Sequence, residues 1–291
     1  MDLKKQEIYD VLDNYNFHEL DIEACLEENQ RARIDTYPDY FFTILHFPKY
    51  NQKTKVYELN EFNVFVGKDY LITFRNFGGN HIDEIFEKYE TLDENYGDEE
   101  EINISSAFIL YEIIQVMLEK MFKVIQNVRS DIKYLEREVF DNVDSSLVRD
   151  IMIKKRNIIL LKNMFKPQLG VMASLESSVN KLFSGKMELY FEDLQDKTGF
   201  IYNDVELLEE YIISIEDAYK TMIDIQTGNI VRLLTVFSAF HLPLTLITGF
   251  YGMNVDNLPF QHNFLMVAMV MLSAFFCMLL IYFVLHRKGK M

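Results

Sequence analysis

Near the end of the chain, one face of a helix-forming stretch carries small and hydroxyl-bearing side chains among apolar ones. Residues at steps of three and four fall on this face: Val231, Leu234, Ser238, Leu242, Thr245, Gly249 and Gly252. Small residues let helices pack closely in lipid. Repeated around a symmetric ring of copies, the same face would line a pore with hydroxyl groups, since one helix per copy can enclose a pore only when several copies meet. The stripe alone supports both interpretations equally.

The stripe lies in the first of two apolar runs. Residues 233–251 form a run of 19 and residues 264–285 a run of 22, and neither contains Asp, Glu, Lys or Arg. About 20 apolar residues cross the hydrocarbon core of a bilayer as a helix, so both runs are predicted membrane spans. The connection 252–263 has no Lys or Arg, whereas Arg232 precedes the first run and Arg287 follows the second. The positive-inside rule therefore predicts a multi-pass protein of the plasma or inner membrane with both termini in the cytoplasm.

The remainder of the chain is acidic, and the formal net charge of the 291 residues is −16. This balance argues against nucleic-acid binding, because phosphates attract basic surfaces. The sequence has no phosphate-binding loop, no nucleophile elbow and no His-Glu-x-x-His motif, so we expect neither nucleotide binding nor enzymatic activity. The first ten residues are charged and lack the apolar core of a signal peptide. Cys25 and Cys277 lie in very different surroundings, which disfavours a structural disulfide.

The N-terminal part combines strand and helix patterns. Residues 40–47 are rich in aromatic and β-branched side chains and predict a strand. Two further β-rich runs, 63–66 and 70–74, flank the turn residues Gly67-Lys68-Asp69 and predict a hairpin. Residues 83–92 predict a helix. The acidic stretch 93–101 is interpreted as a solvated linker rather than a cation trap.

Long helices are predicted next. Apolar residues recur at helical spacing over 105–142, with Ser105 or Ser106 as a cap. A second helix is predicted over 145–164, a break or kink at Pro167, and a third helix over 169–183. A final long helix is expected to begin near Gly199. Helices of this length extend beyond a compact domain, so we expect an antiparallel bundle or an oligomeric stalk.

Together these patterns predict an α+β cytoplasmic domain with long helices, followed by two transmembrane helices in an all-α membrane part. The predicted divisions are an N-terminal α/β domain (1–100), a long-helix stalk (101–228), a first span (229–251), an external turn (252–263), a second span (264–285) and a basic cytoplasmic tail (286–291).

The turn after the first run resembles the signature of the CorA family of magnesium transporters. Tyr251-Gly252-Met253-Asn254 stands directly after a span, with a second span and a basic tail close behind. Pro243-Leu244-Thr245 and Gly249-Phe250-Tyr251 resemble the family's outer first-span pattern, and residues 190–196 resemble its Tyr-Phe-Arg-Asp-Val-Tyr-Asp stretch. The resemblance implies a homopentamer in the lipid bilayer, with a funnel-shaped cytoplasmic domain whose last helix continues into the first span and lines the pore.

The resemblance also implies roles along the stripe. It makes Gly252, Met253 and Asn254 the outer mouth, Thr245 a lower polar ring, and Val231 and Leu234 a narrow hydrophobic gate. Mg²⁺ gives up its water reluctantly. The neutral amide oxygens of Asn254, one from each copy, would hydrogen-bond the hydration shell weakly enough for the ion to leave. The alternative for Asn254 is a helix C-cap.

Two acidic residues would form a regulatory Mg²⁺ site between subunits. Asp193 matches the family's carboxylate, and Asp83 is its expected partner. Our hypothesis is that bound Mg²⁺ clamps the acidic ring closed, and that its loss lets the carboxylates repel and widens the pore at Val231 and Leu234. The alternative for both acids is a plain surface charge.

Three positions depart from the family's pattern. Gly228 stands where Asn is frequent, Val231 stands where Met is usual, and His241 stands where a large apolar residue is common. His241 is either a neutral side chain packed against the second span or a pH-sensitive or metal-contacting residue.

The expected activity is uptake of Mg²⁺ down the membrane potential. The alternatives are a Zn²⁺ transporter or a Co²⁺ or Ni²⁺ transporter of the same architecture, and Met253 favours Mg²⁺ over Zn²⁺. A further alternative is a membrane-anchored helical scaffold without transport. Import and export are not separated by the residues, and the subunit number comes from the resemblance alone.

Overall fold

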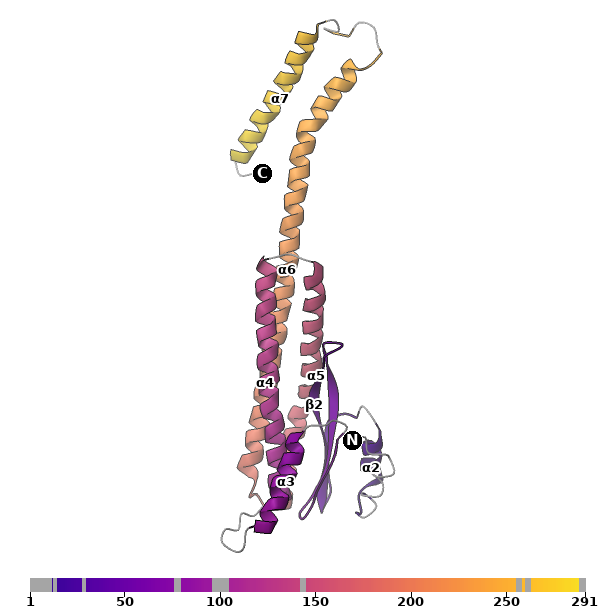
Figure 1. The fold of residues 1–291 in the computed structure, drawn as a ribbon, viewed down its shortest axis with the longest axis vertical. Helices are drawn as coiled ribbons and strands as arrows, with labels where there is room; N and C mark the ends of the chain where they lie inside the picture. Colours follow the sequence, from indigo (N-terminus) through magenta and orange to yellow (C-terminus); the bar gives the residue numbers. More distant parts are fainter. Residues whose placement is uncertain are drawn as a thin grey trace. The chain divides into compact units, whose positions relative to one another are not determined.

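The computed structural model describes residues 12, 15–27, 30–75, 80–95, 105–141, 145–254, 258–259 and 263–287. The chain divides into two compact units, Met1–Asp217 and Ala218–Met291. The long helix α6, Glu188–Tyr251, contributes to both units (Figure 1). The predicted linker beyond residue 95, half of the turn between the spans (255–257 and 260–262) and the tail after residue 287 lie outside the described residues.

The first unit contains a four-stranded antiparallel sheet with the order β1-β2-β3-β4. Its strands are β1 Arg33–Thr36, β2 Tyr40–Asn51, β3 Val56–Gly67 and β4 Leu71–Arg75. The predicted strand over 40–47 and the hairpin around Gly67 are confirmed, and β3 pairs with β4 with Val66 opposite Leu71. Glycine is favoured at position 67, because a side chain there would collide with the ring of Tyr70 unless that ring moved.

Both faces of the sheet are buried over residues 40–47 of β2 and 61–67 of β3, where most side chains are apolar. The other end of the β2–β3 hairpin is more exposed and more polar. On one face, Phe42, Ile44 and Phe65 pack with Phe17 and Ala24 from the N-terminal segment that contains α2, Glu19–Leu26. On the other face lies α5, Ser145–Phe183, which contacts β1, β2 and β3 (Figure 1).

Helix α5 runs through Pro167 without a break, so the prediction of two helices separated at this residue was wrong. Proline removes one backbone donor from the helix, and packing against the sheet compensates for that loss. The next residue, Gln168, donates to the carbonyl of His46 (3.0 Å) and accepts from its N–H (3.1 Å). Strand β1 pairs with β2 only over Phe41–Ile44, so the Gln168 amide replaces β1 beyond its end.

A second amide on α5 holds the sheet in the same way. The side chain of Asn157 accepts from the N–H of Tyr57 (3.1 Å) and donates to the carbonyl of Lys55 (2.9 Å). Both Asn157 and Gln168 are buried, so these bonds are made away from water. Together they determine the position of α5 along the β2–β3 hairpin.

Three more helices complete the first unit. Helix α3 is Asn80–Asn95 and α4 is Ser106–Asp141, which confirms the helices predicted over 83–92 and 105–142. Ser105 caps α4 by accepting the N–H of Phe108 (3.2 Å). Helix α6 begins at Glu188, eleven residues before the predicted start, because Phe191 and Leu194 are already buried.

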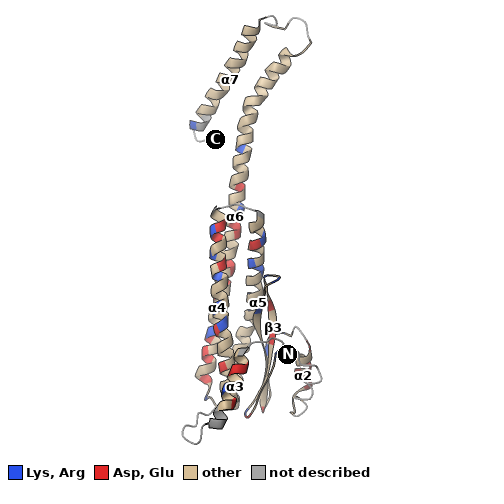
Figure 2. Ribbon diagram, in the orientation of Figure 1, with Lys and Arg blue, Asp and Glu red and all other residues tan. Residues whose placement is uncertain are grey.

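Ion pairs join the long helices of the first unit. Arg129 of α4 contacts Asp204 of α6 (2.8 Å), and Lys162 of α5 contacts Glu209 of α6 (2.6 Å). Figure 2 shows that charged residues of both signs follow α4, α5 and the first part of α6, whereas the later part of α6 and α7 are almost free of charge. The charge pattern therefore changes along a single helix.

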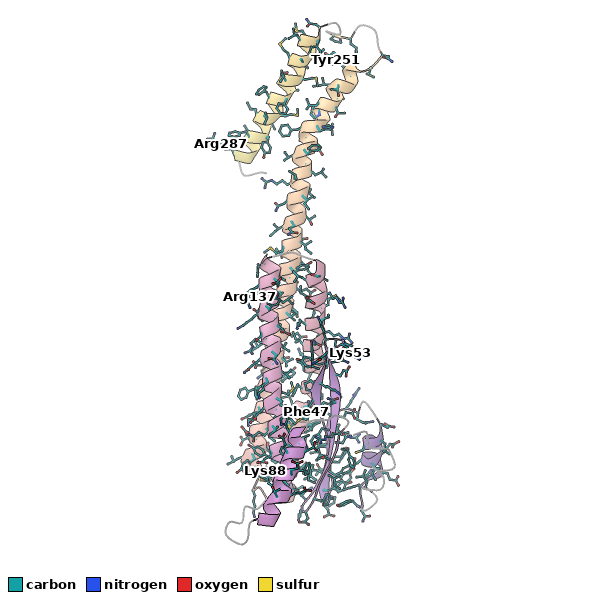
Figure 3. The ribbon with its side chains drawn as sticks, viewed as in Figure 1. Phe47, Lys53, Lys88, Arg137, Tyr251 and Arg287 are labelled. Carbon is teal, nitrogen blue, oxygen red and sulfur yellow. The ribbon has the colours of Figure 1, made fainter. Side chains whose placement is uncertain are left out.

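The second unit consists of the end of α6 and of α7, Phe264–Arg287. Both helices are long and apolar enough to cross a membrane. Helix α6 ends at Tyr251 and α7 ends at Arg287, both labelled in Figure 3. Asn263 caps α7, because its backbone carbonyl accepts the N–H of Met266 (3.1 Å) and its side chain approaches the same donor (3.4 Å).

Candidate functional site

The end of α6 carries a concave surface along one of its faces. It is lined by Phe237, Ser238, His241, Leu242, Thr245, Leu246, Gly249, Phe250 and Met253. Four of the predicted stripe residues are among them: Ser238, Leu242, Thr245 and Gly249. The surface, which we call the α6 groove, continues to Met253 in the turn after the helix.

The opposite face of α6 contacts α7. The ring of Phe240 lies 6.0 Å from the rings of Phe275 and Tyr282, measured between centroids. The partly buried residues of α6 beyond residue 235 follow the same face at helical spacing: Val236, Phe240, Pro243, Leu244, Ile247 and Tyr251. The stripe therefore does not pack against the second span of its own chain. Close packing of this face requires another molecule.

The predicted gate residues lie on α6 before the groove. Val231 is 55% exposed and Leu234 is 62% exposed. The hydroxyl of Thr235, the residue after Leu234, donates to the carbonyl of Val231 (2.8 Å). Two large apolar side chains thus stand uncovered on the stripe at its N-terminal end.

Threonine hydroxyls near the groove donate their protons to their own helix. Thr245 donates to the carbonyl of His241 (3.0 Å), and Thr248 donates to the carbonyl of Leu244 (3.0 Å). A hydroxyl that has donated its proton keeps lone pairs with which it accepts hydrogen bonds. The exposed Thr245 oxygen therefore presents an acceptor toward the groove, which suits water molecules around a cation.

The predicted mouth residues follow the last turn of α6. The N–H of Gly252 donates to the carbonyl of Thr248 (2.9 Å), and the N–H of Met253 approaches the carbonyl of Phe250 (3.4 Å). A β-carbon at Gly252 would stand 3.1 Å from the Thr248 carbonyl oxygen, so this close turn favours glycine. Backbone groups thus close the helix end, and Asn254 follows as an exposed residue.

His241 is a groove residue whose role the sequence left open. Its side chain is exposed, and its ring stacks on that of Phe237 with centroids 5.6 Å apart and planes 10° apart. Within this chain, the imidazole therefore does not pack against α7. Spacing in the sequence would have placed His241 on the stripe, since residue 241 stands three residues after Ser238 and four before Thr245 on the same helical face.

The two predicted regulatory acids each have a cationic partner in the first unit. Asp193 of α6 pairs with Lys197 one turn later (2.6 Å), and its side chain is 45% exposed. Asp83 of α3 pairs with Arg75 at the end of β4, and its side chain is 57% exposed. Within the described residues, no group of three or more His, Cys, Asp or Glu side chains is placed to hold a metal ion.

Comparison with known proteins identifies the family. Residues 1–288 match the family model described as CorA-like Mg²⁺ transporter protein. The cobalt/magnesium transport protein CorA of Thermotoga maritima is 24% identical over 245 residues, which are 84% of this chain and 68% of that protein.

Solved structures agree with this match at the level of the fold. The CorA magnesium transporter of Methanocaldococcus jannaschii superposes with a TM-score of 0.80 at 19% identity, over 96% of this chain and 87% of that chain. The full-length CmaX protein gives a TM-score of 0.76 at 17% identity, over 97% and 85%. The predicted fold of a small sheet, long helices and two terminal apolar helices is confirmed. The chain belongs to the CorA-like Mg²⁺ transporter family.

Proposed function

We propose that the chain is one subunit of a homo-oligomeric membrane channel that admits Mg²⁺ down the membrane potential, with residues 229–251 and 264–285 as its spans. The observation that carries the proposal is the exposed face of α6 on which Ser238 and Thr245 stand among apolar side chains. This face points away from α7 and leads to Gly252-Met253-Asn254. Several copies around an axis would bury this face and enclose an aqueous path. Five copies is the number that the family resemblance implies.

The chemistry of the groove suits a hydrated cation. Asn254 offers a neutral amide oxygen at the mouth, and Thr245 offers a hydroxyl oxygen whose proton is already donated to His241. Neutral oxygen acceptors hold the hydration shell of Mg²⁺ without replacing it. A divalent ion that crosses ~100 mV gains about 4.6 kcal/mol, so an inside-negative potential is a sufficient driving force.

The hydrophobic end of the stripe would act as the gate. Val231 and Leu234 stand exposed on α6 where copies would approach each other. A narrow ring of such side chains excludes water, and a dry constriction stops an ion that keeps its hydration shell. Widening of the ring would let water and Mg²⁺ pass together.

Cytoplasmic Mg²⁺ would control the gate through Asp193 and Asp83. Carboxylate oxygens are ligands that Mg²⁺ accepts, and both acids are exposed enough to be reached. In a single chain each acid is neutralised by its own partner, Lys197 or Arg75. Mg²⁺ bound between copies would compete with these cations, so the site would fill only when internal Mg²⁺ is abundant.

Mutation of the mouth tests the proposal. We expect Asn254→Ala to reduce Mg²⁺ uptake to background in vesicles that contain the full-length protein under an inside-negative potential. Asn203→Ala, at an exposed position on α6 in the first unit, is the matched control and should keep wild-type uptake. Mg²⁺ uptake retained in Asn254→Ala would contradict the assigned mouth.

The same vesicles distinguish the alternative activities. Parallel flux measurements with Mg²⁺, Co²⁺, Ni²⁺ and Zn²⁺ give the ion preference. Uptake of Zn²⁺ without Mg²⁺ would indicate a zinc transporter of this architecture. Absence of flux for every cation, with the protein shown to be inserted, would favour a helical scaffold.

A further inference from the structure

His241 is an ionisable side chain exposed in the middle of an apolar helix. Such residues in membrane spans almost always face the interior of a bundle or a water-filled cavity, because exposure to lipid is costly. His241 shares the α6 groove with Ser238 and Thr245, on the face turned away from α7. Its position therefore places an imidazole on the path proposed for the ion.

Neighbouring groups restrain the orientation of this imidazole. The ring stacks almost parallel on Phe237, one turn earlier, at 5.6 Å between centroids. The backbone at the same residue is held by Thr245, whose hydroxyl donates to the His241 carbonyl (3.0 Å). Two residues later, Pro243 has no N–H to donate to the carbonyl of Ala239. The imidazole thus stacks on an aromatic ring in a mainly apolar groove, with the hydroxyls of Ser238 and Thr245 as its polar neighbours on the same face.

We infer that the His241 imidazoles of neighbouring copies form a binding site for transition-metal dications in the ion path, an inference that rests on the proposed oligomeric channel. One copy supplies a single ligand, and no cluster of three or more metal-ligating side chains exists within the described residues of one chain. The site is therefore complete only between copies. Phe237 positions each ring, and Ser238 lies within the same groove.

Ligand preference predicts which ions this site holds. Imidazole nitrogen suits Co²⁺, Ni²⁺ and Zn²⁺, whereas Mg²⁺ selects oxygen ligands and keeps its water. Hydrated Mg²⁺ would pass the His241 ring, while a transition-metal ion would exchange water for imidazole and remain there. Bound Ni²⁺ or Zn²⁺ would then block Mg²⁺ uptake, and Co²⁺ would pass more slowly than Mg²⁺.

Inhibition of Mg²⁺ uptake tests this site in vesicles that contain the full-length protein. His241→Phe keeps a ring that stacks on Phe237 and removes the ligand nitrogen. We expect the Ni²⁺ or Zn²⁺ concentration that halves Mg²⁺ uptake to rise roughly tenfold or more in this variant, as for loss of a metal-site residue. His81→Gln, which changes an exposed histidine of the first unit, should leave that concentration unchanged. Equal inhibition of the wild type and His241→Phe, with Mg²⁺ uptake intact, overturns the inference.

Co²⁺ binding to the purified protein tests the His241 site even if the protein shows no Mg²⁺ uptake. Co²⁺ added to the purified full-length protein in detergent should give visible absorption bands of nitrogen-ligated cobalt in the wild type and in His81→Gln, and these bands should be lost in His241→Phe. Bands that persist in His241→Phe overturn the site. A wild type that binds Co²⁺ through His241 but moves no Mg²⁺ would contradict the proposed function and leave the metal site standing.

Discussion

The two units of the chain use polar side chains in opposite ways. In Met1–Asp217, buried amides and exposed ion pairs bind one element to another: Gln168 joins α5 to β2, and Arg129 joins α4 to α6. In Ala218–Met291, the threonine hydroxyls of α6 donate to carbonyls of their own helix, and the stripe faces away from the neighbouring helix. The first unit thus pairs these polar groups across elements of one chain. The second presents polar groups that need water, ions or further copies.

This difference also separates two kinds of acid. Asp204 and Glu209 hold helices together through basic partners on other elements. Asp193 pairs only four residues along its own helix, so its ion pair with Lys197 joins no second element. A carboxylate whose partner adds nothing to tertiary structure is freer to exchange that partner for a metal ion. The comparison therefore favours Asp193 over the cross-linking acids as a regulatory ligand.

The largest expected effect on stability is at Gln168. Replacement by Ala would leave the N–H and carbonyl of His46 buried without the amide that now pairs with both. Each buried backbone group left unsatisfied costs about 1–3 kcal/mol, so for two such groups we expect a loss of about 2–6 kcal/mol in the free energy of unfolding. Urea unfolding of the full-length protein in detergent measures it. Gln126→Ala, at an exposed position of α4, should change stability by no more than about 0.5 kcal/mol. Equal stability of the two variants would show that the amide on α5 does not hold the sheet.

A smaller effect concerns the pH dependence of the first unit. Burial lowers the pKa of His46 below its usual value of 6.5, against a smaller opposite effect from the backbone of Gln30. The unfolded chain then binds a proton that the folded chain does not, so stability falls as the pH drops below 6.5. We expect His46→Phe to reduce this loss, by on the order of 1 kcal/mol near pH 5.

Asp21 is expected to change stability with pH in the opposite direction to His46. Burial raises the pKa of this carboxyl above its usual value of 3.8, while hydrogen bonds from Tyr37 and Tyr40 act in the opposite direction. The folded chain binds this proton more tightly, so the contribution of Asp21 to stability is present below pH 3.8 and is lost as the pH rises through the folded-state pKa. Asp21→Asn should remove this loss of stability with rising pH. It should leave in place the loss of stability that His46 causes as the pH falls below 6.5. Unfolding midpoints of the wild type, His46→Phe and Asp21→Asn, measured from pH 4 to pH 8, separate the two contributions. The same dependence of midpoint on pH in all three proteins would contradict both predictions.

The smallest effect on stability is expected at Lys197. Its ion pair with Asp193 is partly exposed, so Lys197→Ala should change the free energy of unfolding by no more than about 0.5 kcal/mol. The same variant frees Asp193 for Mg²⁺, and the Mg²⁺ concentration that closes the channel should fall about twofold. The measurement is Mg²⁺ flux against internal Mg²⁺, with Lys181→Ala on α5 as a control of equal charge. An unchanged closing concentration would favour the reading of Asp193 as a surface charge.

Local sequence patterns were sufficient for most elements. The β-rich runs around Gly67 predicted the β3–β4 hairpin, and the apolar period over 105–142 predicted α4. Pro167 misled the prediction because a proline weakens a helix locally, whereas contacts of α5 with three strands decide whether it continues. The sequence predicts a helix start near Gly199, whereas α6 begins at Glu188 and already buries Phe191 and Leu194 in the core.

Some features of the candidate site also follow from the sequence, whereas others depend on the tertiary structure. Residue types and spacing by themselves determined the two apolar runs, the stripe along the first of them and the turn Gly252-Met253-Asn254, because these features depend only on composition and helical period. Tertiary structure decided which face of α6 meets α7, and hence that the stripe and His241 stand uncovered together. It also decided that Asp83 of α3 pairs with Arg75 of β4. That pairing depends on two elements brought together by packing, whereas the Asp193–Lys197 pair follows from four-residue spacing on one helix.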